Sequence, residues 1–280
     1  MNVILTITRL TFHEAWRRRM VIIALLLGAV YILLYSIGFG FISREIRREG
    51  TPASVLPLVY NMLLLTGLYV VHFLAVMLAI FASVDTVSGE IASHTIQTII
   101  TKTVQRWQVL FGKWLGTAAM LLIYLLLLSG GVIGSTFFQV GYLLPNAIQG
   151  LLVLMLEGVV LISLSMLGGT RLSTMTNGVI LFMLYGLAFI GTWVEQIGSV
   201  FQSDAAVRVG IVTSLIMPVE TLWRRAAYLM QPSSGGFDID NFMTPFGAIS
   251  VPSPAMVAYA VVYAVVALLL AMRAFSRRDL

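Results

Sequence analysis

Two ionisable residues stand inside otherwise apolar stretches, and they are the first candidates for chemistry. Glu157 lies within VLMLEGVVLIS and His72 within LYVVHFLAV. A charged side chain at the centre of a membrane costs about 3 kcal/mol on insertion scales, so it normally faces the protein interior. Glu157 can then serve as a substrate or proton site, or it can bond to a neighbouring helix through Ser163 or Asn177. For His72 the alternatives are a shared role with Glu157 and simple packing in the core.

Other kinds of reactive site find no support in the residue types. The chain has no cysteine, which excludes disulfides, thiolate chemistry and cysteine-bound metals. The three histidines, His13, His72 and His94, stand on separate segments, so no metal site is expected. Glu157 and His72 look isolated from each other, which argues against an intramembrane hydrolase. The chain lacks the G-x-x-x-x-G-K-[ST] phosphate-binding loop, so it is expected to hold no nucleotide or other cofactor and to catalyse no reaction.

The composition is that of an integral membrane protein. Hydrophobic residues make up 59% of the 280 residues, charged residues only 10%, and the mean hydropathy is +0.96. A soluble protein carries roughly 25% charged residues. The apolar runs are long, which favours spanning helices over the short alternating segments of a β-barrel. The net charge of +5 fits positive flanks on the cytoplasmic side, and no nucleic-acid partner is expected.

The elements expected are an N-terminal amphipathic helix and six spans, all within one transmembrane domain of residues 1–280. Residues 1–19 combine an apolar face with basic side chains, which is typical of a helix lying in the membrane interface. No cleavable signal peptide is expected, because no small-residue cleavage site follows the basic residues at 17–19. The spans are expected at 20–42, 58–82, 114–138, 149–169, 176–194 and 256–275, each long enough to cross the hydrocarbon.

The distribution of Lys and Arg predicts the orientation. With six spans both termini share a side, and that side and its connections carry 11 basic residues against 6 on the other. Cytoplasmic connections are the richer in Lys and Arg. We therefore expect a multi-pass protein of the cell membrane with cytoplasmic N- and C-termini, surrounded by lipid.

The segment 195–254 is expected outside the cytoplasm, as a re-entrant or interfacial element and a loop. Residues 209–218 are apolar but too few to cross, and VETLWRRAAYLM reads as an amphipathic helix. Arg224 and Arg225 on this helix can meet lipid phosphates or an extracytoplasmic partner. If 209–229 crossed instead, the basic C-terminus RAFSRRDL would lie outside, against the charge rule.

The stretch 83–113 is a polar connection between the second and third spans, expected on the cytoplasmic side. Asp85 and Ser88 are suited to helix capping where the second span ends. Beyond them, apolar residues recur every three or four positions with Thr and Gln between them. This pattern predicts a short helix with one apolar face, whose mixed surface a protein partner would cover.

The same stretch resembles the membrane subunits of ABC-2 type transporters. After the second span these have an acidic residue and a Gly-Thr, then a short helix, Pro-Val-Ser-Arg and a Gly-Lys. The matching residues here are Glu90, Thr95, Val104, Arg106, Gly112 and Lys113. His94 and Thr103 stand where that family commonly has Gly and Pro. The elbow-like N-terminal helix and the six-span layout extend the resemblance over nearly the whole chain. MPVETLWRRAAYLM resembles the subgroup of the nitrous-oxide-reductase maturation permease.

The resemblance implies an ATP-driven transporter, most often an exporter. Two copies of the chain, or the chain and a related permease, would form the translocation pathway. Two copies of a separate ABC ATP-binding subunit, holding ATP and magnesium, would dock on the connection between spans two and three. The coupling residues it implies are Glu90, Thr95, Ile96, Gln97, Arg106 and Lys113.

Two other functions remain open from the residues alone. A secondary transporter or channel would use Glu157 and His72 as its ion-coupling site. A membrane anchor or assembly factor for another complex would transport nothing itself.

Overall fold

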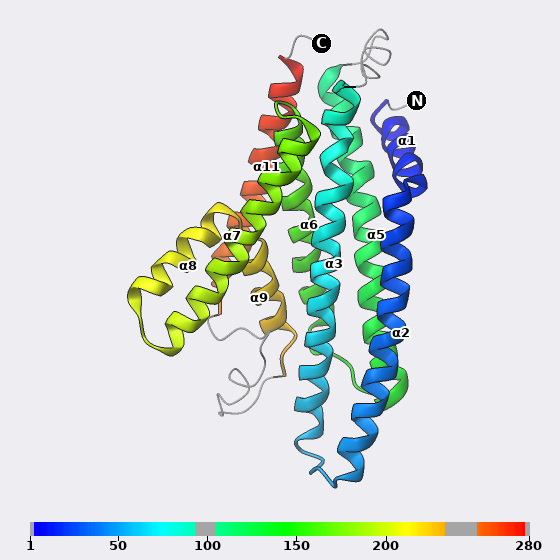
Figure 1. Cartoon of the computed structure of the whole chain (residues 1–280), viewed down its shortest axis with the longest axis vertical. Helices are drawn as coiled ribbons and strands as arrows, with labels where there is room; N and C mark the ends of the chain where they lie inside the picture. Colours follow the sequence, from blue (N-terminus) through cyan, green and yellow to red (C-terminus); the bar gives the residue numbers. More distant parts are fainter. Residues whose placement is uncertain (1–2, 93–104, 233–250, 278–280) are drawn as a thin grey trace.

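The chain folds into α-helices throughout the residues that the computed structural model describes, which are 3–92, 105–232 and 251–277 (Figure 1). The helices are α1 (Val3–Arg17), α2 (Arg19–Arg48), α3 (Leu56–Ala92), α5 (Arg106–Val140), α6 (Ala147–Gly169), α7 (Thr174–Val200), α8 (Asp204–Ile216), α9 (Val219–Leu229) and α11 (Pro254–Ser276). The predicted all-helical membrane fold is confirmed.

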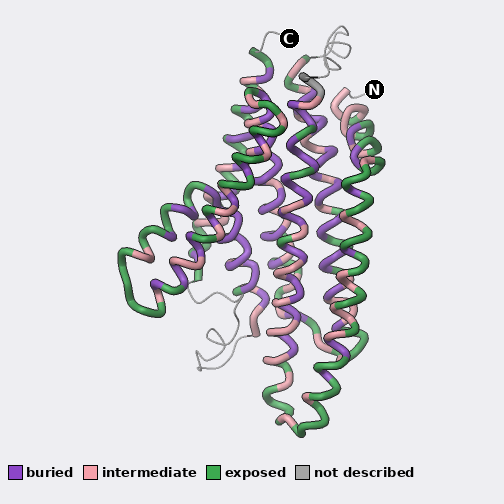
Figure 2. Tube along the Cα trace, viewed as in Figure 1, coloured by how far each residue is buried: buried purple, intermediate pink, exposed green. Residues whose placement is uncertain are grey.

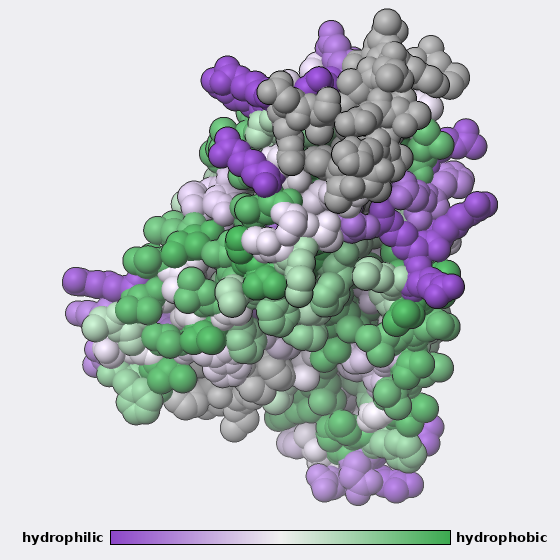
Figure 3. All heavy atoms as spheres, turned by 45° about the horizontal axis from the view of Figure 1, so that its top comes forward, coloured by the Kyte–Doolittle hydropathy of each residue, from purple (hydrophilic) through white to green (hydrophobic). Residues whose placement is uncertain are grey.

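Six of these helices, α2, α3, α5, α6, α7 and α11, are long and apolar enough to cross a membrane. The shortest has 23 residues, or about 35 Å at 1.5 Å per residue, against a hydrocarbon thickness of about 30 Å. Burial is concentrated on α3, α5, α6 and α9, whereas α2 and α8 mostly face outward (Figure 2). A hydrophobic surface lies between hydrophilic groups at the two ends (Figure 3). The six predicted spans are confirmed.

The two chain ends lie at the same end of the bundle, together with the last turns of α3 and the first turns of α5 (Figure 1). The connection between α2 and α3 lies at the opposite end. An even number of spans requires this arrangement of the termini.

The helix α3 runs further than the sequence pattern indicates. The hydroxyls of Ser83, Thr86 and Ser88 each donate to the carbonyl oxygen four residues earlier, at 2.5 to 2.9 Å. Since their polar groups are satisfied by their own helix, these residues need not end it. The predicted capping by Asp85 and Ser88 is therefore wrong, because both lie inside α3.

The amphipathic helix expected at the N-terminus is confirmed as α1, and it packs against the first half of α5. A Cβ on Gly112 would lie 2.8 Å from Ile7, and one on Gly116 would lie 2.8 Å from Thr11 and from the carbonyl oxygen of Thr8. The two glycines, four residues apart on one face of α5, thus allow close backbone contact.

The pair α8–α9 forms a bent hairpin, in the arrangement expected of a re-entrant element. Along α7, Gly198 approaches Ala206 of α8 and Gly191 approaches Thr213, so α8 runs antiparallel to α7 and back into the bundle. The chain then bends by 104° into α9. Each helix is too short to cross alone, with 13 and 11 residues.

The far end of α9 returns to the side from which α8 set out. Asn61, in the first turns of α3, donates from Nδ2 to the carbonyl oxygen of Met230 at 2.9 Å and to the hydroxyl of Tyr142 at 3.1 Å. Burial raises the pKa of that Tyr142 hydroxyl, which lies in the connection between α5 and α6. These contacts fix the hairpin at the end of the bundle opposite the termini.

The contact between α1 and α5 gives a matched pair of variants. Gly116→Ala should lower the stability of the protein by about 1–3 kcal/mol, because the added methyl group overlaps the α1 backbone. On the same helix Gly130 has no atom within 4 Å of a Cβ, so Gly130→Ala should be neutral or stabilising by up to about 1 kcal/mol. Thermal unfolding of the detergent-purified variants measures both. Equal melting temperatures would show that α1 does not rest on Gly116.

Candidate functional site

The two intramembrane residues singled out from the sequence meet in the structure, and a third joins them. His72 Nδ1 lies 2.8 Å from Oε2 of Glu157, and His72 Nε2 lies 3.3 Å from Oε1 of Glu220. The side chains of His72, Glu157 and Glu220 are 0%, 4% and 3% exposed. They come from α3, α6 and α9 respectively. We refer to these three residues as the buried cluster.

The partners expected for Glu157 from the sequence are wrong. Ser163 Oγ accepts from Nε1 of Trp114 at 3.0 Å and donates within its own helix. Asn177 donates to the carbonyl oxygen of Ser165 at 2.9 Å. Both polar side chains are thus engaged elsewhere. Glu157 and His72, which look isolated in the sequence, are hydrogen-bonded to each other.

The buried cluster lies at mid-depth in the bundle. At about 1.5 Å per residue, His72 stands roughly 24 Å along α3 from Leu56 and roughly 30 Å from Ala92. Glu157 is near the middle of α6, and Glu220 is the second residue of α9. Glu220 therefore sits at the tip of the re-entrant hairpin, just after the bend, where the hairpin reaches the two spanning helices.

Aromatic rings enclose the imidazole of His72. The ring centroid of Tyr69, on the same helix, lies 5.4 Å away, and that of Trp223, on α9, lies 5.2 Å away. The two aromatic rings also pack edge to face against each other. From α7, the buried hydroxyl of Tyr185 lies beside Glu220, yet it meets no hydrogen-bond partner at normal distance in the described part of the chain.

The geometry fits a doubly protonated imidazole better than a metal site. Each ring nitrogen faces one carboxylate oxygen, so an imidazolium can donate to both. The carboxylates flank opposite edges of the ring and do not converge on one point. Within residues 3–92, 105–232 and 251–277, no group of three or more potential ligands is placed to hold a metal ion.

A second buried interaction fixes the same hairpin. Arg224, on α9, donates from both terminal nitrogens to the two oxygens of Glu195 on α7, each at 2.9 Å. The side chains are 2% and 7% exposed. Both roles expected for Arg224, at lipid phosphates or at an extracytoplasmic partner, are wrong because its guanidinium is inside the protein. Its neighbour Arg225 donates to the carbonyl oxygen of Pro252 at 3.3 Å.

Sequence reasoning did not assign a role to Glu220 or Glu195. Glu220 was concealed in a segment that reads as a surface amphipathic helix, and Glu195 stands at the end of an apolar run. The available signal was the spacing of Glu220 and Arg224, which places opposite charges on one face of a helix flanked by apolar segments.

Three of the residues expected to couple to an ATPase belong to the helices α3 and α5 that flank the connection. Glu90 is in the last turn of α3, and Arg106 is the first residue of α5. Lys113 lies further along α5 and is only 5% exposed, next to the glycine that contacts α1. Thr95, Ile96 and Gln97 fall outside the described residues.

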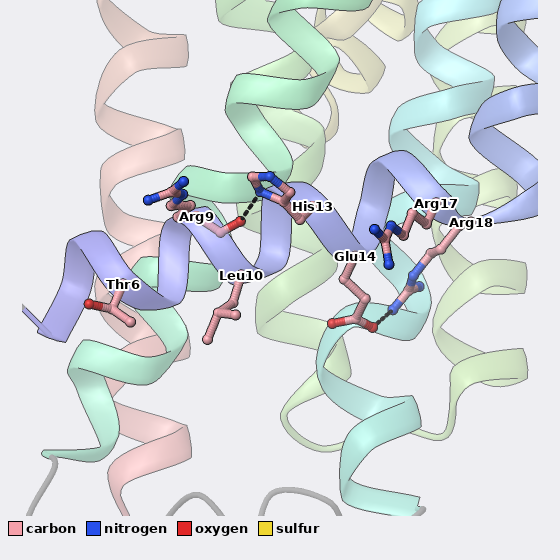
Figure 4. A pocket seen from close by; sticks show the side chains of 7 residues that line it. All are labelled: Thr6, Arg9, Leu10, His13, Glu14, Arg17 and Arg18. Carbon is pink, nitrogen blue, oxygen red and sulfur yellow. Dashed lines mark hydrogen bonds and ion pairs between the residues drawn. The ribbon is translucent and has the colours of Figure 1, made fainter.

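The outer face of α1 forms a shallow basic groove at the end of the bundle that carries the termini (Figure 1). It is lined by Thr6, Arg9, Leu10, His13, Glu14 and Arg17 of α1 and by Arg18, which joins α1 to α2 (Figure 4). Arg18 donates to Glu14 at 3.0 Å and to Asp85 of α3 at 3.2 Å. A basic helix of this kind is typical of the boundary between lipid and water. The ion pair of Arg18 with Asp85 holds α1 against α3.

Comparison with known families gives one assignment for nearly the full chain. Residues 5–280 match the family model described as ABC-2 family transporter protein. The match includes α1, the buried cluster and both helices that flank the connection between α3 and α5. No curated protein gives a significant match.

The buried pair Glu195–Arg224 can be tested by removing one or both charges. Glu195→Leu or Arg224→Leu alone should cost about 3–5 kcal/mol of stability, because each leaves an uncompensated buried charge. The double variant should recover most of that loss. Glu45→Leu breaks the exposed pair of Glu45 with Arg48, 3.7 Å apart, and should change stability by less than about 1 kcal/mol. If the double variant melts as low as the sum of the single losses, the two charges do not compensate each other.

Proposed function

The chain belongs to the ABC-2 family of transporter proteins, and we propose that two copies of a separate ATP-binding subunit drive it through the connection between α3 and α5. Within that family the chain is the membrane subunit, which has no catalytic activity and binds no cofactor itself. We further propose that it works as a pair, with a second copy or a related permease, and that the pair exports its substrate.

The observation that carries this proposal is the position of the connection. Its flanking residues, Ala92 and Arg106, lie at the end of the bundle that also holds both chain termini (Figure 1). The N-terminal segment contacts both helices that flank the connection, because Arg18 pairs with Asp85 of α3 and α1 packs on Gly112 of α5. A partner docked there would contact one continuous surface formed by α1, the last turns of α3 and the first turns of α5. We refer to this surface as the platform.

The helix α3 mechanically connects that platform to the membrane interior. It is continuous over 37 residues and carries His72 roughly 30 Å below its platform end. A tilt imposed on the last turns of α3 would move His72 relative to Glu157 and Glu220. An ATPase that never touches the substrate would in this way favour one conformation of the pathway over another.

Separate observations support the orientation, the subgroup and the direction of transport that we propose. Cytoplasmic termini follow from the 11 to 6 distribution of basic residues. We base membership in the subgroup of the nitrous-oxide-reductase maturation permease on MPVETLWRRAAYLM, which contains all of α9. Export is the direction that the sequence resemblance implies.

One observation favours a second candidate, a secondary transporter driven by an ion gradient. Intramembrane carboxylates paired with histidine are typical of ion-coupling sites, and the buried cluster is such a group. The long polar connection between α3 and α5 has no evident purpose in that function.

Copurification separates the two candidates. The tagged chain, isolated in mild detergent from its own cells, should carry ATP hydrolysis activity with it. Glu90→Lys and Arg106→Glu should abolish that activity, because they reverse charges where the partner docks. Arg48→Glu reverses an exposed charge at the opposite end, at the end of α2, and should leave it unchanged. A chain that purifies without ATPase and moves solute under an ion gradient alone would refute the coupling proposal.

The proposed orientation can be tested by cysteine labelling, since the chain has no cysteine of its own. Ala53→Cys places a thiol in the exposed connection between α2 and α3, and Ser276→Cys places one at the exposed end of α11. A membrane-impermeant maleimide added to intact cells should label residue 53 and should label residue 276 only after permeabilisation. The reverse pattern would place the termini outside.

A further inference from the structure

We propose that the buried cluster is a binding site for one exchangeable proton, and that the tip of the hairpin α8–α9 stays against α3 and α6 only while this proton is bound. This inference goes beyond the proposed function and does not depend on an ATPase partner. It rests on the residues His72, Glu157 and Glu220 and on the elements that carry them.

The first argument is the charge of the cluster. One imidazole lies between two carboxylates, so the fully ionised cluster has a net charge of −1. At 0–4% exposure, an unbalanced charge has no water to stabilise it. One added proton gives an imidazolium, one carboxylate and one carboxylic acid, with a net charge of zero. Like charges sharing a buried site favour this uptake of a proton.

Among the residues that the structure describes, the groups around the cluster do not supply the missing positive charge. The ionisable side chains that face the cluster from the adjoining elements are Tyr69 of α3 and Tyr185 of α7, and Trp223 of α9 adds only an aromatic ring. The guanidinium of Arg224, one turn further along α9, is held by both oxygens of Glu195. That pair is neutral as a unit.

The buried hydroxyl of Tyr185 lies beside Glu220. A tyrosine hydroxyl can both donate and accept a hydrogen bond, so it can contact Glu220 whether or not that carboxyl carries the proton. Glu157 lies closer to the imidazole, at 2.8 Å, than Glu220 does, at 3.3 Å.

A proton fits this site where a larger cation does not. The carboxylates lie at opposite edges of the imidazole, and the rings of Tyr69 and Trp223 pack against it. A metal ion or an organic cation would need oxygen ligands that converge and a volume of its own. A proton needs neither.

The location of Glu220 connects proton binding to movement. His72 and Glu157 belong to the spanning helices α3 and α6, whereas Glu220 belongs to the tip of the hairpin. When the cluster transfers its added proton to water, two carboxylates face one imidazolium and the net charge becomes −1. Withdrawal of Glu220 toward water relieves this charge, so deprotonation releases the tip of the hairpin.

Infrared spectroscopy of the purified protein tests the proton itself. At neutral pH we expect a carbonyl stretching band of a buried carboxylic acid that disappears as the pH is raised. Glu220→Gln should remove the band, because it leaves one carboxylate for the one imidazolium. Tyr185→Phe, which keeps the ring but deletes the hydroxyl beside Glu220, should shift the band to higher frequency. Glu49→Gln, at the exposed end of α2, is the matched control and should change nothing. The proposal is overturned if the unmodified protein shows no such band, or if neither Glu220→Gln nor Tyr185→Phe changes the band.

Spin labels test the movement. Phe73→Cys on α3 and Val212→Cys on α8 are exposed positions in a chain without other cysteines. The distance distribution between them should shift and broaden as the pH is raised through the loss of the infrared band. In Glu157→Gln the cluster is neutral without an added proton, so the distribution should stay at its low-pH form. A distribution independent of pH in the unmodified background, or a shift that persists in Glu157→Gln, refutes the proposed release. Neither measurement uses an ATPase, so a failure of the proposed function would leave both results intact.

Discussion

Placing a charged helix inside a membrane protein is the constraint on which this structure depends. The sequence of α9, VETLWRRAAYL, is polar enough for a surface helix, yet its residues from Val219 to Arg224 are buried. Each unpaired charge at that depth would cost several kcal/mol. The cost is avoided because Arg224 pairs with Glu195 and Glu220 pairs with His72. Two different spanning helices therefore supply the partners that allow α9 to enter.

Those partnerships dictate much of the remaining architecture. For α9 to reach mid-depth from the end opposite the termini, α8 must carry the chain inward, and it does so along the glycines of α7. A Cβ on Gly210 would lie 2.2 Å from that of Glu195, so the close contact of α7 with α8 also positions the carboxylate that receives Arg224. Packing of small residues and pairing of charges thus specify the same placement of the hairpin, which favours a single folded arrangement.

The sequence predicts the elements of this fold better than their polar contacts. Hydropathy gives the six spans because a run of about 20 apolar residues has few alternatives in a chain of this composition, and the shortness of 209–218 indicates a re-entrant segment. The contacts of the buried cluster were not predictable in this way, since Glu157 and Glu220 stand 85 and 148 residues along the chain from His72. Hydropathy scores each polar residue by itself. The position of a buried charge depends instead on which distant helix carries the residue of opposite charge. The helical continuation through Ser83 and Ser88 was missed for a local reason, namely that hydroxyls which favour helix ends can also bond to the preceding turn.

The two buried charge groups of α9 differ in a way that assigns them different roles. Glu195 and Arg224 form a bidentate pair with equal and opposite charges, so the pair is balanced as it stands and holds the hairpin under ordinary conditions. The buried cluster has one carboxylate more than its single imidazole can balance, so its charge depends on a proton. A hairpin fixed by both groups would keep its attachment to α7 while its tip loosens from α3 and α6. Because α3 extends without a break to the platform where a motor subunit would dock, the loosened tip is also the part of the hairpin that a tilt of α3 would reach. Proton binding and a movement imposed from the platform would then act on the same contact, His72 with Glu220, from opposite ends.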